Sequence, residues 1–214
     1  MKHSKGIIFQ ADNVIALIAG TKQQTRRMVK LTEFGESNTD GYDWHFRDRR
    51  SVWNDFHNDR IAERCPYGKP GTELHVKEAF AIVPMLSGAD RQYGDQGVRY
   101  RATWTKTHSG RWLSPLHMPR ACSRITLKLT DVRVQRVQAI TEDDAKAEGV
   151  PPFFERYDRI GKDQRIACGD EENFLAVDFP HRASYACMWD EINGDTALWS
   201  ANPCVWALTF EVMQ

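Results

Sequence analysis

Two long segments of alternating apolar and polar residues constrain the fold most strongly. The segment SRITLKLTDVRVQRV keeps its apolar residues on one face of a strand as far as Leu129, and Val132 then begins the opposite parity. This change of face predicts a bulge or turn near Asp131. The segment CVWALTFEV, residues 204–212, alternates in the same way and predicts a strand with one apolar face. Both segments therefore predict β-sheet structure.

Shorter patterns predict helices at three places. The segment DNVIALIAG combines Asp12 as a capping residue with Gly20 as a left-handed stop. In ITEDDAKAEGV, Thr141 and Asp144 resemble a capping box, and Gly149 ends the segment. The buried stripe of the first helix is expected to consist of Val14, Ile15, Leu17 and Ile18. A third helix is predicted from apolar residues at helical spacing, namely Tyr185, Met188, Trp189 and Ile192.

Few helices, several strands and long loops together predict an α+β domain with an antiparallel, barrel-like sheet. Another strand is predicted where the turn of GKPGTELHV is followed by the alternating residues Leu74 and Val76. At 214 residues, one hydrophobic core is the simplest expectation. A formal net charge of zero with 41% hydrophobic residues argues against disorder and against a uniformly basic surface.

The N-terminus and the cysteines indicate the cellular compartment. No apolar run approaches the roughly 18 residues needed to span a bilayer, and MKHSKGIIFQAD lacks the apolar stretch of a signal peptide. A cytoplasmic protein without a membrane segment is therefore expected. The five cysteines are widely spaced and without a C-x-x-C pattern, which predicts reduced thiols. A zinc site built from Cys168, Cys187 and His181 is the weaker alternative, because this spacing matches no familiar zinc motif.

Cationic residues gather in two segments although the net charge is zero. Between Gln96 and Thr130 there are seven Lys or Arg residues and no acidic residue, interleaved with aromatic residues. Residues 21–30 add four cations, again without an acid. Because cations bind phosphates and aromatic faces stack on bases, both segments are candidates for nucleic-acid binding. The alternative is a solvated strand face neutralised by the acidic residues of 131–191. The candidate binding residues of the longer segment are Trp104, Trp112, Arg120 and Arg124.

Glu148 and a cluster of polar residues around Lys22 are unusual for different reasons. A carboxylate in the last turn of a helix faces the negative end of the helix dipole, which costs about 0.3–1 kcal/mol at the surface. Lys22 and Thr25 follow the end of a predicted helix. A buried lysine that the neighbouring Arg26 and Arg27 keep neutral could take a proton from a threonine hydroxyl. Ordinary surface positions also explain these residues, so the residue types alone leave the choice open.

The spacing G-x-K-x-x-T-x-R, formed by Gly20, Lys22, Thr25 and Arg27, resembles the signature at the end of the first helix in ASCH domains. The segments GKPGTELHV, ITEDDAKAEGV and CVWALTFEV follow in the order of that family. The resemblance implies a PUA-like β-barrel with flanking short helices, formed by a single domain over residues 1–214. The segments without a counterpart in the small members of the family are expected to be long insertions, at about 31–64, 81–116 and 150–182.

The better-understood relatives in this family are small bacterial N(4)-acetylcytidine amidohydrolases, which use a lysine, a threonine and a glutamate. The resemblance assigns these roles to Lys22, Thr25 and Glu148. The longer form, with SPLHMPRACSRITL and WSANPCVW, is more similar to the ASCH proteins of phages and prophages. The implied reaction is hydrolysis of an acyl amide on the exocyclic amine of a modified cytosine nucleoside, without a metal or other cofactor. Arg26 and Arg27 would stabilise developing negative charge or a phosphate.

Two other functions stay open from the sequence. A non-catalytic module would bind RNA or a modified base, because PUA-like barrels often read RNA. A ribonuclease would use lysine or histidine as acid and base, for which His108 and His117 are available. In each case the expected partner is a modified nucleoside or a nucleic acid, and no membrane partner is expected.

Overall fold

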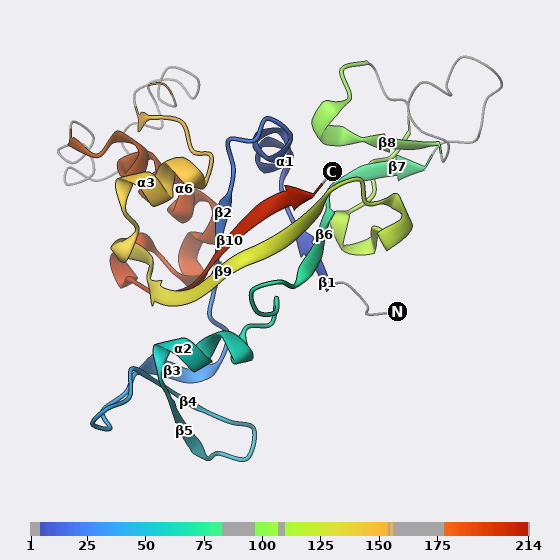
Figure 1. Cartoon of the computed structure of the whole chain (residues 1–214). Coiled ribbons are helices and arrows are strands. Elements are labelled where there is room, and N and C mark those ends of the chain that lie inside the picture. The colour runs from blue at the N-terminus through green and yellow to red at the C-terminus, as the bar shows by residue number, and fades with distance from the viewer. Residues whose placement is uncertain (1–4, 83–96, 107–109, 154, 156–177, 214) are drawn as a thin grey trace.

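Five strands form a mixed sheet in the order β1-β6-β9-β10-β2 (Figure 1). This computed structural model describes residues 5–82, 97–106, 110–153, 155 and 178–213. The fold is α+β, as predicted. The strands of the sheet are β1 (Lys5–Ile8), β2 (Gln24–Met28), β6 (Glu73–Lys77), β9 (Thr126–Arg136) and β10 (Cys204–Met213).

The sheet is mixed rather than wholly antiparallel, because β1 runs parallel to β6 while the other neighbours are antiparallel. The chain has room for the crossover that a parallel pair requires, since α1 (Ala11–Ile18), β2 and a second, small sheet lie between these two strands. The edge strands β1 and β2 are nevertheless close together. Arg27 Nη2 donates a hydrogen bond of 2.9 Å to the carbonyl oxygen of Ile8. In a flat sheet of this width the edges would lie about 19 Å apart, so the sheet is strongly curled.

The long pair of β9 and β10 confirms the predicted irregularity near Asp131. The register shifts between Thr209 and Phe210, where Asp131 and Leu129 are the partners, so Thr130 is the extra residue. Strand β10 is buried on both faces near its start, not on the single apolar face that was predicted. Val205 and Ala207 are buried as well as the alternating residues up to Phe210, because α6 (Pro180–Asn193) packs on the second face.

Helix α1 begins at Ala11 and has no side-chain cap, so the predicted capping role of Asp12 is wrong. Gly20 has a φ of +74°, which confirms the predicted left-handed stop. The expected four-residue stripe is only half buried. Val14 and Leu17 are buried, whereas Ile15 and Ile18 are 48% and 53% exposed. Each exposed residue follows a buried one by about 100° around the helix and therefore points away from the sheet.

Helices α3 (Glu142–Ala147) and α6 are held against each other beside β2, at the end of the sheet away from the C-terminus (Figure 1). The Thr141 hydroxyl accepts a hydrogen bond from the Asp144 amide, which confirms half of the predicted capping box. The other half is absent because the Asp144 carboxylate binds other partners. The carboxylate of Glu142 accepts hydrogen bonds from the amides of His181 and Arg182 at the start of α6. One helix thus caps the other.

In α6, Tyr185 and Trp189 are buried as predicted, and Met188 is partly buried. Ile192 is 49% exposed, which contradicts its predicted place in the buried stripe. Ile192 also lines a cavity beside the helix. Ile192 is therefore exposed at least partly because its side chain faces that cavity.

The first expected insertion, 31–64, is ordered. It forms a three-stranded antiparallel sheet and the short helix α2 (Asn58–Ile61), and its residues Trp44 and Ile61 belong to the main core. The described residues of 81–116 contribute part of a two-stranded sheet and short turns. The additional strands are β3 (Thr32–Glu36), β4 (Trp44–Arg47), β5 (Trp53–Phe56), β7 (Phe80–Ile82) and β8 (Val98–Tyr100). Much of 150–182 lies outside the described residues.

The cysteines differ from the expectation at one position. Cys65, Cys122 and Cys204 are free, but Cys187 is disulfide-bonded, so the prediction of five reduced thiols is wrong for Cys187. Of the two other proposed zinc ligands, Cys168 lies outside the described residues. His181 Nδ1 lies 2.8 Å from the carbonyl oxygen of Val150. The described part of the chain contains no cluster suited to a metal ion, and no helix in it is long and apolar enough to cross a bilayer.

Candidate functional site

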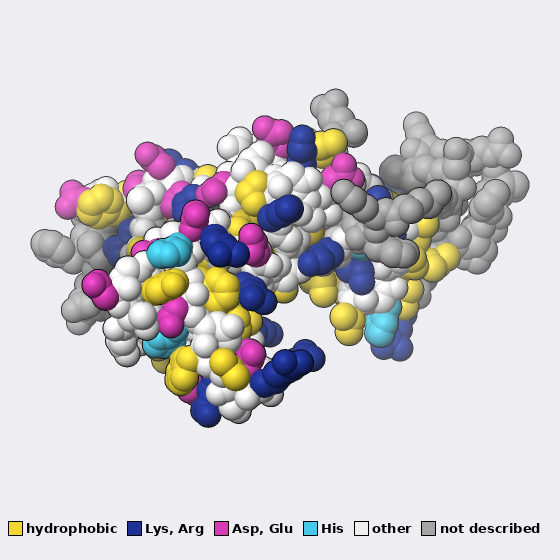
Figure 2. Space-filling model, turned by 60° about the horizontal axis from the view of Figure 1, so that its bottom comes forward, with side chains coloured by type: hydrophobic (Ala, Val, Ile, Leu, Met, Phe, Trp, Pro, Cys, Tyr) yellow, Lys and Arg dark blue, Asp and Glu magenta, His cyan; other side chains and the backbone are white. Residues whose placement is uncertain are grey.

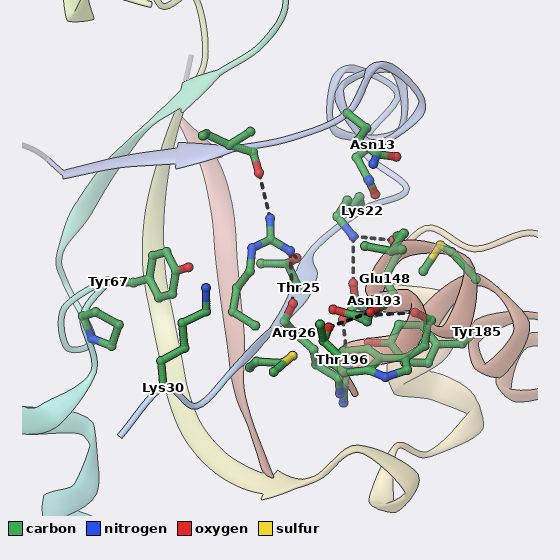
Figure 3. Close-up of a pocket in the computed structure, with 18 of the residues that line it drawn as sticks. Asn13, Lys22, Thr25, Arg26, Lys30, Tyr67, Glu148, Tyr185, Asn193 and Thr196 are labelled. Atoms are coloured by element: carbon green, nitrogen blue, oxygen red, sulfur yellow. Dashed lines mark hydrogen bonds and ion pairs between the residues drawn. The ribbon is translucent and has the colours of Figure 1, made fainter. Parts of the chain in front are cut away.

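A cavity of about 890 Å³ lies beside strand β2, between the curled sheet and helix α6 (Figure 3). Its volume is near the upper end of the range for small-molecule sites, about 300–1,000 Å³. The five residues that the sequence singled out around the first motif and at the end of α3 all line it, namely Lys22, Thr25, Arg26, Arg27 and Glu148. Residues more than 120 positions apart in the chain therefore meet at one opening.

The polar segment QTRRM forms strand β2, although no apolar alternation predicts a strand there. It does so because it pairs with the apolar strand β10, with Thr25 opposite Leu208. Strand alternation then sorts the side chains into two groups. Gln24 and Arg26 donate hydrogen bonds to carboxylates of the α3 segment, whereas Arg27 donates to the Thr25 hydroxyl.

Lys22 is completely buried and is held by Glu148. Its Nζ donates hydrogen bonds to Glu148 Oε2 at 2.8 Å and to the Glu148 carbonyl oxygen at 2.7 Å. Glu148 is the C-cap residue of α3, so Lys22 places positive charge at the negative end of that helix. This arrangement explains how a carboxylate is tolerated there.

Burial lowers the pKa of Lys22 from its ordinary value of 10.5, because the ammonium ion loses its hydration. The charge of Glu148 and its hydrogen bond act in the opposite direction. The positive charges of Arg27 and Arg26 lower the pKa further. The site therefore contains a lysine whose neutral form is more accessible than that of a surface lysine.

Arg26 connects the two carboxylates of the α3 segment. Its Nη1 lies 3.1 Å from Glu148 Oε1 and its Nη2 lies 2.7 Å from Asp144 Oδ2. Asp144 also accepts hydrogen bonds from Gln24 and Arg133. Burial alone raises the pKa of Asp144, but these hydrogen bonds and the charges of Arg26 and Arg133 outweigh it, so the pKa lies below the ordinary 3.8. Asp144 is thus an ionised anchor for Arg26.

Thr25 lies beside Arg27 in the same cavity. The Thr25 hydroxyl accepts a hydrogen bond of 2.9 Å from Arg27 Nη1, which leaves its own proton available for donation. The Arg27 guanidinium lies 5.0 Å from the centre of the Phe9 ring and is tied to Ile8, so its position is fixed. Among the described residues, Lys22 and Thr25 form no hydrogen bond with each other. Both side chains face the cavity (Figure 3).

Gly149 allows the end of the α3 segment to pack closely against Lys22. Its φ is +75°, and a Cβ atom added there would lie 3.0 Å from Cβ of Lys22 and 3.1 Å from Cβ of Ala16. A glycine is therefore required both by the backbone conformation and by the close packing of Lys22.

Sequence reasoning missed several residues of the site. Tyr185 lines the cavity, and burial, assisted by the charge of Glu148, raises its pKa well above 10, so its hydroxyl is a neutral donor. Asp144 was interpreted only as a capping residue, although its spacing of four from Glu148 places both carboxylates on one helix face. Lys30 also lines the cavity and belongs to the cationic segment 21–30, which was a candidate for nucleic-acid binding. Further lining residues with no signal in the sequence are Asn13, Arg64, Tyr67, Asn193 and Thr196.

The candidate binding residues of the longer cationic segment lie elsewhere. Arg124 binds Glu78 through two hydrogen bonds of 2.8 and 2.9 Å and lies over the Tyr100 ring. Trp104 stacks with Arg99, at 4.4 Å from its guanidinium carbon. Of the described residues that line the cavity, none comes from this segment; the candidates that lie outside it are Trp104, Trp112, Arg120 and Arg124.

Of the two histidines considered for ribonuclease chemistry, the structure describes one, His117. His117 is exposed and does not line the cavity, and His108 lies outside the described residues. The face drawn in Figure 2 carries Lys and Arg side chains across its middle, while acidic side chains are more frequent toward the end with α3 and α6.

Comparisons of the chain with protein-family models, with curated proteins and with solved structures found no match.

Proposed function

We propose that this protein is an amidohydrolase that removes an acyl group from the exocyclic amine of a modified cytosine nucleoside such as N(4)-acetylcytidine. The observation that carries the proposal is the shared cavity of Lys22, Thr25 and Glu148, in which burial lowers the pKa of Lys22. The chemistry needs a nucleophile and a base that is neutral near physiological pH. The motif resemblance to ASCH domains supplies the substrate class.

In the first step, the neutral amine of Lys22 takes the proton of the Thr25 hydroxyl as the threonine oxygen attacks the acyl carbon. A neutral amine has two N–H groups and one lone pair. Glu148 accepts two hydrogen bonds from Nζ, which uses both N–H groups and leaves the lone pair for the hydroxyl proton. Arg27, already bonded to the Thr25 oxygen, stabilises the negative charge that develops nearby.

In the second step, the C–N bond breaks and the ammonium of Lys22 returns its proton to the leaving amine. Water then hydrolyses the acyl ester on Thr25, which releases the carboxylic acid and restores the hydroxyl. Glu148 acts by positioning Lys22, because its carboxylate oxygens are occupied by Lys22 and Arg26. Positioning is the role that this geometry supports, since Oε2 accepts a hydrogen bond from Lys22 and Oε1 accepts one from Arg26.

The PUA-like barrel is part of the same proposal. The hydrogen bond from Arg27 to Ile8 brings the two edge strands of the five-stranded sheet together, as closure into a barrel requires. The main core lies inside this curve and includes Leu127 and Trp206. The curled sheet supports a barrel-like architecture, and the order of the motifs supports its assignment to the ASCH type.

The test is incubation of the full chain with N(4)-acetylcytidine, with acetate and cytidine measured by chromatography. Wild type is expected to release both, Thr25→Ser is expected to retain part of the activity, and Thr25→Ala is expected to lose it by a factor of about 10³ or more. Absence of turnover by folded wild-type protein on this and related N(4)-acylated nucleosides would contradict the proposal.

A non-catalytic binding module is the second candidate. The observation that favours it is the missing hydrogen bond between Lys22 and Thr25, because each side chain already has partners of its own. In that case the cavity would hold a modified base by hydrogen bonds alone. Tight binding of N(4)-acetylcytidine with no acetate release, unchanged in Thr25→Ala, would favour this module over the enzyme.

A further inference from the structure

We infer that the outer part of the cavity is a phosphate subsite formed by Lys30 and Arg64, so that the substrate is a phosphorylated form of the nucleoside. This inference rests on the proposed function and names its substrate class. The shared chemistry is a phosphate group attached to the ribose, either the monoester of a nucleotide or the diester of a polynucleotide.

The charges that line the cavity carry the inference. In the part of the chain that the structure describes, the acidic lining residue is Glu148, and it is already shared by Lys22 and Arg26. Lys30 and Arg64 also line the cavity, and neither forms an ion pair with a described carboxylate. The opening therefore has an excess of positive charge that an anionic group would balance.

The position of Lys30 separates this charge from the reacting groups. Lys30 is an exposed residue just after β2, and Figure 3 shows it with Tyr67 on the side of the cavity away from Glu148 and Tyr185. A substrate whose acyl group lies at Thr25 would extend its sugar toward Lys30. The phosphate would then bind at the far wall.

Arg64 lines the same cavity as Lys30 and comes from the end of residues 31–64, which form an ordered unit. Its guanidinium carbon lies 5.0 Å from the Phe56 ring centre and 5.7 Å from the Phe46 ring centre. Stacking on two aromatic rings of β4 and β5 orients the guanidinium while leaving its N–H donors available. The insertion therefore supplies a pre-positioned phosphate ligand, which a nucleoside enzyme without this segment would lack.

The test compares the equilibrium binding of cytidine, cytidine 5′-monophosphate and a short cytidine-containing oligonucleotide by calorimetry with the full chain. Wild type is expected to bind at least one phosphorylated probe about tenfold more tightly than cytidine, and increasing salt is expected to reduce this ratio. The double variant Lys30→Ala, Arg64→Ala is expected to bring the ratio close to one. A matched control, Arg49→Ala with Lys69→Ala, removes the same charge from exposed positions outside the cavity and is expected to keep the wild-type ratio.

The two probes distinguish the sources of the phosphate. Preference for the monophosphate indicates a nucleotide, and preference for the oligonucleotide indicates a polynucleotide. Equal binding of cytidine and both phosphorylated probes, or equal loss in the control variant, would overturn the subsite. Turnover of acetylcytidine without a phosphate preference would overturn the subsite alone, whereas phosphate-dependent binding without turnover would overturn the proposed reaction alone.

Discussion

Two buried carboxylates in this protein, Glu78 and Glu148, are almost equally inaccessible, at 2% and 3% exposure, yet their surroundings differ. Glu78 forms a paired-hydrogen-bond contact with Arg124, and that arginine lies over an aromatic ring. Neither Glu78 nor Arg124 lines the cavity. Glu148 is divided between Lys22 and Arg26 and faces an opening large enough for a ligand.

The comparison shows that a buried ion pair is not in itself a sign of function. The Glu78–Arg124 pair matches two donors to two acceptors and is complete without a ligand. At Glu148 one of the two cations is a lysine, whose pKa burial lowers, and the Thr25 hydroxyl lines the same cavity. The combination of an adaptable cation, a hydroxyl and an opening distinguishes the candidate site.

The largest expected difference between the two carboxylates is in activity. Glu148→Gln is expected to reduce kcat/KM for N(4)-acetylcytidine by a factor of about 10² or more, because Lys22 loses its charged positioning partner. Glu78→Gln is expected to leave kcat/KM unchanged and to reduce the free energy of unfolding by about 1–3 kcal/mol. Steady-state kinetics and denaturant unfolding of the two variants measure both effects. Equal activity losses would remove the distinction.

The pH dependence sharpens the comparison. The proposed mechanism requires neutral Lys22, and the pKa of Lys22 lies below 10.5. The value of kcat/KM is therefore expected to rise about tenfold per pH unit and to reach its plateau before pH 10.5. The charge of Glu148 raises the pKa of Lys22, so Glu148→Gln is expected to move the rise to lower pH. Glu78→Gln is expected to leave the profile in place. A rise that shifts equally in both variants would contradict the role of Lys22.

A pair of glycine variants tests the packing at the site with a smaller effect. Gly149 and Gly71 have φ values of +75° and +87°, so alanine is expected to cost about 1 kcal/mol of stability at either. Only at Gly149 does the added Cβ meet Lys22, so only Gly149→Ala is expected to lower kcat/KM, by about fivefold. Thermal unfolding and kinetics separate strain from displacement of the lysine. Comparable activity loss in Gly71→Ala would show that strain alone is responsible.

The sequence predicted those parts of the fold that depend on local patterns. The bulge near Asp131, the end of the first helix at Gly20 and the strand containing Leu74 follow from alternation and glycine conformation, and all three are confirmed. The parallel pairing of β1 and the order within 31–64 were missed. They depend on pairing between distant segments, which local periodicity does not encode.

The site could be predicted in part for the same reason. The motif resemblance named Lys22, Thr25 and Glu148, and all three line one cavity. Composition alone pointed equally to the cationic segment with Arg124, because a count of charges does not reveal that Glu78, 46 positions earlier, neutralises that arginine. Lys30 was only one of four cations in residues 21–30, and Arg64 carried no signal, because the sequence does not reveal which cations line the opening.

The central claim is that Lys22 and Thr25 act as one unit, and a double-mutant cycle tests it most directly. The kcat/KM for N(4)-acetylcytidine is measured for wild type, Lys22→Met, Thr25→Ala and the double variant, each checked for folding by circular dichroism. Each single variant is expected to lose a factor of about 10³ or more, and the double variant about the same as the worse single variant. The account would be contradicted if the loss in the double variant equalled the product of the two single losses, or if either single variant kept near wild-type activity.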